Sequence, residues 1–291
     1  MANMERHLGI DIGGTNIACG IVNENCEIVA RSKVKTNSPR PYAEILADII
    51  RAAELACAEA GITPQQLASI GIGCPGTCNQ ATGVVEYSNN LGFVNAPLRT
   101  DIESRFGVST YLGNDADAAA YGEYCAGAAK GAGSAVVITL GTGVGSGIII
   151  DGKIYSGSNF AGEIGHTVIE VDGRPCTCGR KGCFEAYSSA TGLVNTTREY
   201  AEKFPDSLMA ELIKNEGKVS ARTAYIAMKQ GDEAGKLVTD LYVKYLAVGI
   251  TNVINIFQPD ILCIGGLQRG RHAARSAEKG GRRAGLFQEK R

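Results

Sequence analysis

The chain has 291 residues, with 29 basic and 30 acidic side chains, a formal net charge of -1 and 44% hydrophobic residues. This length exceeds one ordinary core, so two lobes are expected, and the balanced charge gives no electrostatic reason to expect binding to nucleic acid or to a membrane surface. No apolar run approaches the ~20 residues that cross a bilayer. The start lacks the apolar segment and cleavage site of a secretion signal. We therefore expect a cytoplasmic protein.

The first part of the chain alternates between strand and helix patterns. Short apolar runs at His7–Ile12, Ile17–Val22 and Glu27–Val34 predict a β-meander whose first turn is rich in glycine. Apolar residues then recur at helical spacing from Pro41 to Gly61, with proline near the start and glycine after the end. A buried strand ending in a turn is predicted at Ser69–Gly76.

The second part begins in the same way as the first. Ser109–Asp115 predicts a strand running into a helix, and Ala135–Gly157 again predicts a strand, a glycine-rich turn and two further strands. A long helix is expected at Glu233–Phe257, followed by a strand at Pro259–Gly266 that ends in paired glycines. The two similar glycine turns are about 130 residues apart, which predicts a duplicated α/β lobe with mixed sheets and a cleft between the copies.

Glycine turns after strands can bind phosphate, because bare backbone N–H groups approach an anion closely there. No G-x-x-x-x-G-K-[ST] motif occurs, and LGTGVGSG does not satisfy G-x-G-x-x-G, since Ser146 holds the last glycine position. A tight β-hairpin is the alternative interpretation of each turn alone. Two Gly-Thr turns in matching places, with a third glycine pair near residue 266, favour a nucleotide held by its phosphates.

Six motifs occur in an order that resembles the ROK family of sugar kinases and sugar-responsive repressors, over residues 8–266. They are DIGGTN (Asp11–Asn16), GCPGT (Gly73–Thr77), GNDADAAA (Gly113–Ala120), LGTGVGSG (Leu140–Gly147), GEIGH (Gly162–His166) and CTCGRKGCFE (Cys176–Glu185). The resemblance implies a two-lobed, actin-like fold of the hexokinase and Hsp70 ATPase type, which we expect to divide into lobes 1–115 and 116–266. It also implies ATP-dependent phosphorylation of a hexose, and the similarity to the glucokinases of this family favours D-glucose.

The resemblance assigns the catalytic and nucleotide-binding roles. Asp115 matches the catalytic aspartate, which accepts the proton of the sugar hydroxyl. From the residues alone, Asp115 or Asp117 could instead cap the following helix. Asp11 matches the aspartate near the metal and phosphates, and Mg²⁺ would arrive bound to ATP. The other expected nucleotide-binding residues are Gly13, Gly14, Thr15, Asn16, Gly141, Thr142, Gly143, Gly265 and Gly266.

A sugar site should collect side chains that both donate and accept hydrogen bonds. The family's sugar-contacting positions match Asn114, Asp115, Glu163, His166 and Glu185. Asn90 is a further candidate, with Asn89 competing for the same position. Glu163 could also be an ordinary surface residue, because a buried carboxylate is costly.

Three of the ten cysteines, Cys176, Cys178 and Cys183, are clustered. Together with His166 they supply one nitrogen and three sulfur ligands, which suits a tetrahedral structural zinc site. A redox pair would favour C-x-x-C, which is absent, and unmetallated thiols are the remaining alternative. Zinc would hold His166 and Glu185 at the same wall of the sugar pocket.

A sugar-sensing regulator is the non-enzyme alternative. Such family members carry a helix-turn-helix domain before the kinase-like body, whereas here the first predicted strand begins at His7, so we expect an enzyme. The rival substrates are N-acetylmannosamine, fructose, mannose and allose. The family also suggests a homodimer.

The tail at residues 267–291 departs from the family pattern, since it is rich in arginine and glycine and has no apolar stripe. Back-translated with a one-base shift, it can read CNEGDMLLAPLKRVVEERVFSKKN, which restores such a stripe. We therefore expect a frameshift after Gly266, and disorder there if the tail is genuine.

Overall fold

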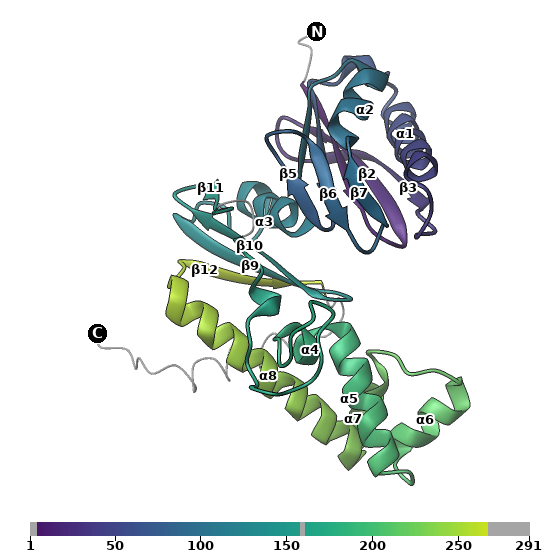
Figure 1. The fold of residues 1–291 in the computed structure, drawn as a ribbon, viewed down its shortest axis with the longest axis vertical. Coiled ribbons are helices and arrows are strands. Elements are labelled where there is room, and N and C mark those ends of the chain that lie inside the picture. The colour runs from purple at the N-terminus through teal and green to yellow at the C-terminus, as the bar shows by residue number, and fades with distance from the viewer. Residues whose placement is uncertain (1–4, 158–160, 267–291) are drawn as a thin grey trace. The chain divides into compact units, whose positions relative to one another are not determined.

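The computed structural model describes residues 5–157 and 161–266, which form two compact units (Figure 1). One unit comprises Met1–Gly133 with Gly147–Ala161, and the other comprises Ser134–Ser146 with Gly162–Arg291. The division into lobes 1–115 and 116–266 stays a prediction. The frameshift and disorder expected at residues 267–291 lie outside the described residues.

The first unit is built on a five-stranded sheet with strand order β3-β2-β1-β4-β8. Its strands are β1 (Arg6–Ile12), β2 (Asn16–Asn23), β3 (Ile28–Lys35), β4 (Ser69–Cys74) and β8 (Thr110–Asn114). The first three form the predicted antiparallel meander, and β4 runs parallel to both β1 and β8. Because parallel strands end at the same edge of a sheet, the residues after β1, β4 and β8 lie along one edge.

Helix α1 (Tyr42–Glu59) packs against β1, β2 and β3, and it spans the helix predicted from Pro41 to Gly61. Its buried side chains recur every three or four residues, and Ile45 and Ile49 have no solvent exposure. Fully burying one such isoleucine contributes roughly 1.5–3 kcal/mol. This apolar stripe, rather than any side-chain cap, therefore fixes α1 on the sheet.

The sequence did not reveal a second, three-stranded sheet in this unit, with strand order β5-β6-β7. Its strands are β5 (Thr77–Asn79), β6 (Val84–Ser88) and β7 (Phe93–Ala96), and they are too short for a clear alternating pattern. Further elements of this unit are the 3₁₀ turn η1 (Pro64–Gln66), α2 (Leu98–Phe106) and α3 (Asp115–Ala126). As predicted, α3 begins directly after β8.

A further, four-stranded sheet has strand order β11-β10-β9-β12. Its strands are β9 (Ser134–Leu140), β10 (Val144–Ile150), β11 (Lys153–Ile154) and β12 (Ile261–Gly265). β12 pairs with β9 in parallel, and β11 pairs with β10 antiparallel. Both predicted segments of strands are therefore confirmed, and this sheet, like the five-stranded one, contains both parallel and antiparallel pairs.

Within its described residues, the second unit also holds the short 3₁₀ turn η2 and five helices, of which α8 is the longest and contacts the other four (Figure 1). These elements are η2 (Ile164–His166), α4 (Glu185–Ser188), α5 (Ala190–Lys203), α6 (Leu208–Glu216), α7 (Thr223–Lys229) and α8 (Glu233–Phe257). The ring of Phe184 packs so closely over Gly249 of α8 that a side chain at that position would overlap it. This contact fixes the start of α4 against α8.

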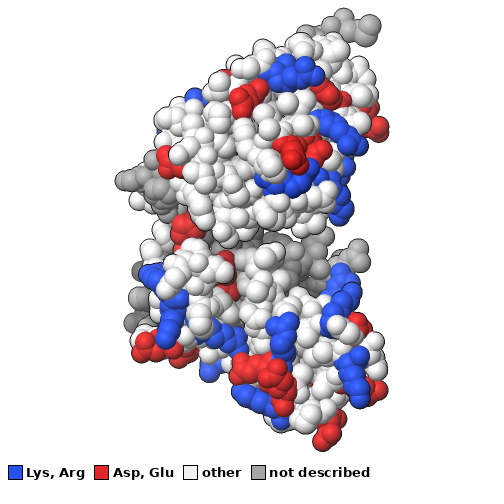
Figure 2. Space-filling model, turned by 45° about the vertical axis from the view of Figure 1, so that its right-hand side comes forward, with Lys and Arg blue, Asp and Glu red and all other residues white. Residues whose placement is uncertain are grey.

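By length and composition, α8 is apolar enough to cross a membrane, but half of its most apolar stretch is buried inside the unit. Its buried residues, such as Tyr242, Leu246 and Ile250, recur at helical spacing, as in the core helix of a globular protein. On the face drawn in Figure 2, basic and acidic side chains are interspersed, which agrees with the net charge of -1. The expected cytoplasmic location stays a prediction.

Candidate functional site

The first glycine turn, Gly13–Thr15, joins β1 to β2 and is held by Thr36, a buried residue just after β3. The Thr36 hydroxyl donates to the Gly13 carbonyl at 2.6 Å, and the Thr36 N–H donates to the Thr15 carbonyl at 3.0 Å. Gly13 N–H donates a hydrogen bond to the Asn16 carbonyl, which closes the turn. Among the described residues, the N–H groups of Gly14 and Thr15 find no acceptor, so they are available to an anion.

Asp11 and Asp115 lie beside the end of β4: Asp11 pairs with Gly73, and the Asp115 Cα lies 3.4 Å from the position that a side chain on Gly73 would take. The Cys74 thiol lies there, fully buried. Its hydrogen bond with Cys78 and its burial raise the pKa of Cys74 well above the usual value, and the nearby charges of Asp115 and Asp11 raise it further. Desolvation by the surrounding protein atoms also raises the pKa of Asp11. The two expected acidic residues are therefore brought together.

Asn114 has a structural role in addition to any contact with sugar. Its side-chain oxygen accepts from the N–H groups of Ala116 at 2.8 Å and Asp117 at 3.4 Å, which caps α3. Its side-chain amide donates to the Gly76 carbonyl at 3.2 Å. Asn114, rather than Asp115 or Asp117, is thus the N-cap residue of α3. Asp115 is the first residue of the helix, at the edge where β4 and β8 end.

Asn90 lies beside the first glycine turn. A side chain added to Gly14 would meet the Asn90 carbonyl at 3.7 Å, and the Asn90 carbonyl itself accepts from the Ser38 hydroxyl at 2.5 Å. Asn89 instead accepts a hydrogen bond from the Tyr87 hydroxyl, at 3.3 Å. Asn90 therefore lies against the first turn, and its role as a sugar contact stays a prediction.

In the second unit, the glycine turn Gly141–Gly143 joins β9 to β10 and is held from the start of α5. Ala190 N–H donates to the Gly141 carbonyl at 2.8 Å, and the Thr191 hydroxyl donates to the Thr142 carbonyl at 2.7 Å. Within the described part of the chain, the N–H groups of Thr142 and Gly143 donate to no acceptor. This turn therefore offers two neighbouring donors, as the first one does.

Glu185 connects the cysteine segment to this turn. One of its carboxylate oxygens accepts from Val144 N–H at 2.9 Å, and the other lies 3.9 Å from Cys176 Sγ. The carboxylate occupies the space that a side chain on Gly143 would need, so Glu185 would have to move to make room for one. Glu185 was expected to bind sugar, and its contact with the turn was not foreseen.

The third glycine pair, Gly265 and Gly266, ends β12 beside the second turn. The backbone of Gly266 has φ +100°, and a side chain there would come within 2.8 Å of Leu140 N. β12 pairs with β9 up to Gly265 and Thr139. The expected second and third nucleotide-binding glycine segments are therefore adjacent.

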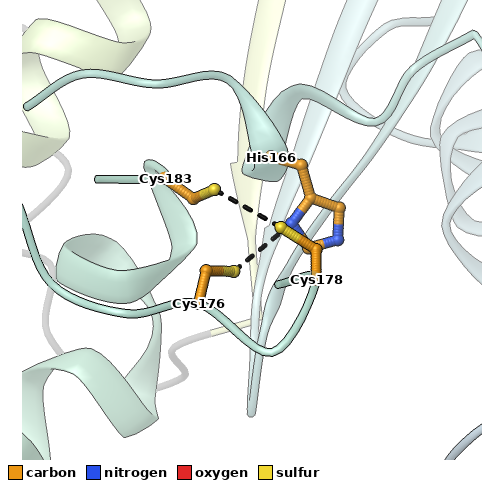
Figure 3. Close-up of side chains that lie close together, drawn as sticks. All are labelled: His166, Cys176, Cys178 and Cys183. Atoms are coloured by element: carbon orange, nitrogen blue, oxygen red, sulfur yellow. Dashed lines mark hydrogen bonds between the residues drawn. The ribbon is translucent and has the colours of Figure 1, made fainter. Parts of the chain in front are cut away.

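The structure gathers His166, Cys176, Cys178 and Cys183, whose ligand atoms all lie within 4.8 Å of one another (Figure 3). Cys176 Sγ lies 3.6 Å from His166 Nδ1, and Cys178 Sγ lies 3.6 Å from Cys183 Sγ. A tetrahedral zinc ion with bonds of 2.0–2.3 Å separates its ligands by about 3.5–3.8 Å. Two of the separations match these values, and three sulfurs with one nitrogen are a ligand set that zinc takes.

The surroundings of the cysteines affect their thiols differently, because burial raises the pKa of the Cys183 thiol to about 12. The Arg180 backbone N–H lowers the pKa of the Cys178 thiol to about 7, so this ligand ionises readily. Gly182 has φ +76° and lies against the Glu170 carbonyl, where a side chain would clash. Arg174 holds the neighbouring segment through Thr196 at 2.6 Å and Glu199 at 2.8 Å.

The remaining expected sugar residues, Glu163 and His166, lie at η2 of the second unit. His166 points Nδ1 toward the cysteines and Nε2 toward Glu163, whose nearest carboxylate oxygen is 4.0 Å away. The Glu163 side chain is 60% exposed, so it carries no burial cost. One imidazole can therefore bind a metal with one nitrogen and face a ligand with the other.

Comparison with known proteins shows which family the chain is similar to. A family model described as the ROK family matches residues 7–269. A glucokinase from Thermotoga maritima is 34% identical over 264 residues, which covers 89% of this chain and 81% of that protein. A putative xylose repressor from Caldicellulosiruptor is 32% identical, covering 89% of this chain and 65% of the repressor. Among solved structures, a ROK family glucokinase from Streptomyces griseus in complex with glucose and AMPPNP has a TM-score of 0.84 and 31% identity, covering 98% of this chain and 91% of that one.

Proposed function

Because the chain belongs to the ROK family, we propose that it is a glucokinase, which transfers the γ-phosphoryl group of ATP to the 6-hydroxyl of D-glucose. The observation that carries this proposal is the similarity to glucokinases along most of the chain, including a structure that holds glucose and an ATP analogue. Four of the six motifs that predicted the family form the two glycine turns and the cysteine cluster with His166.

The glycine turns would bind the phosphates of ATP. Each turn presents two neighbouring backbone N–H groups, from Gly14 and Thr15 in the first turn and from Thr142 and Gly143 in the second. Such donors can neutralise phosphate charge without moving during the reaction. Mg²⁺ bound to ATP would neutralise further charge, and Asp11 is the carboxylate at the first turn that suits it.

Asp115 would act as the catalytic base. Its place at the end of β8, on the same sheet edge as the first turn, suits a carboxylate that accepts the 6-hydroxyl proton as the oxygen attacks phosphorus. Ala116 N–H donates to one Asp115 carboxylate oxygen at 2.9 Å, which fixes the side chain. Asn114, which caps the same helix, would orient Asp115 in addition to contacting the sugar.

The sugar ring would be bound by Asn90, Asn114, Glu163, His166 and Glu185, each of which can exchange hydrogen bonds with hydroxyls. A structural zinc ion, held by Nδ1 of His166 and the three cysteine sulfurs, would stabilise the loop that carries these groups in the second unit. His166 Nε2 and Glu185 would then be presented to the sugar from a rigid segment. Because three thiolates and an imidazole complete the tetrahedron, the zinc would take no part in the chemistry.

A sugar-sensing regulator is the alternative supported by the similarity to a putative xylose repressor. The presence of Asp115 favours the enzyme, because a regulator needs no base for phosphoryl transfer. Within the enzymes, N-acetylmannosamine, fructose, mannose and allose remain the rival acceptors. The homodimer suggested by the family stays a proposal.

A hexose panel tests the proposal. Purified protein with ATP and Mg²⁺ is assayed for ADP release with glucose and with each rival sugar, and zinc in the same sample is measured by atomic absorption. We expect the highest kcat/KM for glucose. A strong preference for another hexose would show that this hexose, and not glucose, is the substrate. Binding of sugar without any ADP release would favour the sugar-sensing regulator.

A further inference from the structure

Each glycine turn is tied down by one threonine from a distant part of the chain. Thr36 lies 23 residues after Gly13, and Thr191 lies 49 residues after Thr142. In both cases the threonine hydroxyl donates to a carbonyl in the turn, at 2.6 Å and 2.7 Å. The two turns belong to different units, so the same arrangement is built twice.

The effect of these hydrogen bonds on the turn follows from peptide geometry. A trans peptide is planar, and its C=O and N–H groups point in opposite directions. When the Thr191 hydroxyl holds the Thr142 carbonyl, the N–H of Gly143 must therefore point away from α5. The hydrogen bond from Thr36 to the Gly13 carbonyl likewise directs the N–H of Gly14 away from Thr36.

The other backbone groups of the second turn are also engaged. Ala190 N–H holds the Gly141 carbonyl, Gly141 N–H donates to the Gly143 carbonyl, and Val144 N–H donates to Glu185. Within the described residues, only the N–H groups of Thr142 and Gly143 are left without an acceptor in this turn. Thr191 thus holds one of the two peptides whose donors remain available.

We infer that Thr36 and Thr191 are positioning residues for nucleotide binding, which fix the phosphate-facing N–H groups of the two glycine turns through the carbonyls behind them. This inference rests on the proposed kinase function. Neither threonine needs to touch the nucleotide. Without the threonine hydrogen bond the turn would still join its two strands, but its peptides could rotate. Nucleotide binding would then have to order these peptides, which would weaken the affinity.

Thr191 provides the cleaner test because its side chain is exposed, so its replacement should not disturb the core. Thr191→Val keeps the shape and removes the hydroxyl, and Thr191→Ser restores a donor. Thr100→Val makes the same change at an exposed threonine of α2 and serves as the matched control. Thr36→Val and Thr36→Ser repeat the comparison at the buried site, with thermal unfolding used to verify folding.

The measurement is the affinity for MgATP by calorimetry without sugar, followed by KM for ATP and KM for glucose. Loss of one net hydrogen bond predicts about fivefold weaker ATP binding by Thr191→Val, with KM for glucose unchanged and Thr191→Ser close to wild type. ATP affinity of Thr191→Val within twofold of wild type, an equal loss in Thr100→Val, or no rescue by serine would overturn the inference.

The two proposals can fail separately. A wild-type protein that binds MgATP but phosphorylates no hexose overturns the kinase function, while the calorimetry still decides the role of Thr191. A wild-type protein that binds no nucleotide overturns both.

Discussion

Replacing Cys178 by serine should abolish binding of the proposed zinc ion and weaken glucose binding more than it slows phosphoryl transfer. Cys178 lies 3.6 Å from Cys183 and is one of four groups that suit the metal. Without the metal, the loop from Cys176 to Cys183 would lose the contacts that hold His166 and Glu185 in place. Asp115, in contrast, belongs to the first unit and depends on none of these contacts.

The expected magnitude follows from Glu185. This carboxylate lies 3.9 Å from Cys176 and 2.9 Å from Val144 N–H, so it is positioned by the cysteine segment on one side and by the turn on the other. A hydrogen bond to a charged group contributes about 1.5–3 kcal/mol, and 1.4 kcal/mol corresponds to a factor of ten. Losing one such bond to a sugar hydroxyl should raise KM for glucose roughly 10- to 100-fold. KM for ATP should change less, because Ala190 and Thr191 still hold the second turn.

The assay combines zinc content with steady-state kinetics for wild type, Cys178→Ser and Cys26→Ser. Cys26 is exposed in the turn between β2 and β3, outside the cluster, and its replacement should leave both quantities unchanged. Full zinc content and unchanged sugar affinity in Cys178→Ser would refute the reasoning. A fall in kcat without any rise in KM for glucose would show that the loop acts on the chemical step instead.

Two further predictions concern α3 and the tail. Asn114→Ala removes the cap of α3 and the hydrogen bond to Gly76, so the free energy of unfolding in urea should fall by about 1–2 kcal/mol. Asn114→Asp keeps the capping oxygen and should lose less stability. Equal stability of Asn114→Ala and wild type would contradict this role. Sequencing the gene across the codons for Gly265 to Leu267 should reveal a one-base shift. The restored segment would then supply an apolar face for β12, whose Ile261, Leu262 and Ile264 are only half-buried, and an intact frame in good reads would remove the frameshift hypothesis.

The long elements were predictable because their signals are local. The stripe of α1 and the apolar spacing of α8 span many residues, so the predicted and observed bounds agree within two residues. The short strands β5, β6 and β7 gave no such signal. Tyr87 and Val94 pair across β6 and β7 with more than half of each side chain exposed, so apolar and buried positions do not coincide there.

The candidate site was predictable where residues of the right chemical type lie close together in the sequence. The three cysteines lie within eight residues of sequence, and the structure groups them with His166, as the predicted ligand set requires. Thr36 and Thr191 could not be found in this way, because a hydroxyl that binds a carbonyl 23 or 49 residues away is placed by the tertiary fold. The hydrogen bond from Val144 N–H to Glu185 was missed for the same reason, since 41 residues separate the two. The resemblance to the family, which the comparisons confirm, supplied the sugar and nucleotide roles that spacing alone left open.

The most direct test of the central claim is the rate of glucose 6-phosphate formation from glucose and MgATP by wild type, Asp115→Asn and Asp117→Asn. Asparagine at residue 115 keeps an oxygen for Ala116 N–H but cannot accept the proton, so kcat should fall about 10²- to 10⁴-fold. Asp117 lies in the first turn of the same helix but does not match the family's catalytic position, so its replacement should leave kcat within about threefold. Comparable turnover by Asp115→Asn and wild type, or no glucose 6-phosphate from the wild-type protein, would contradict the account.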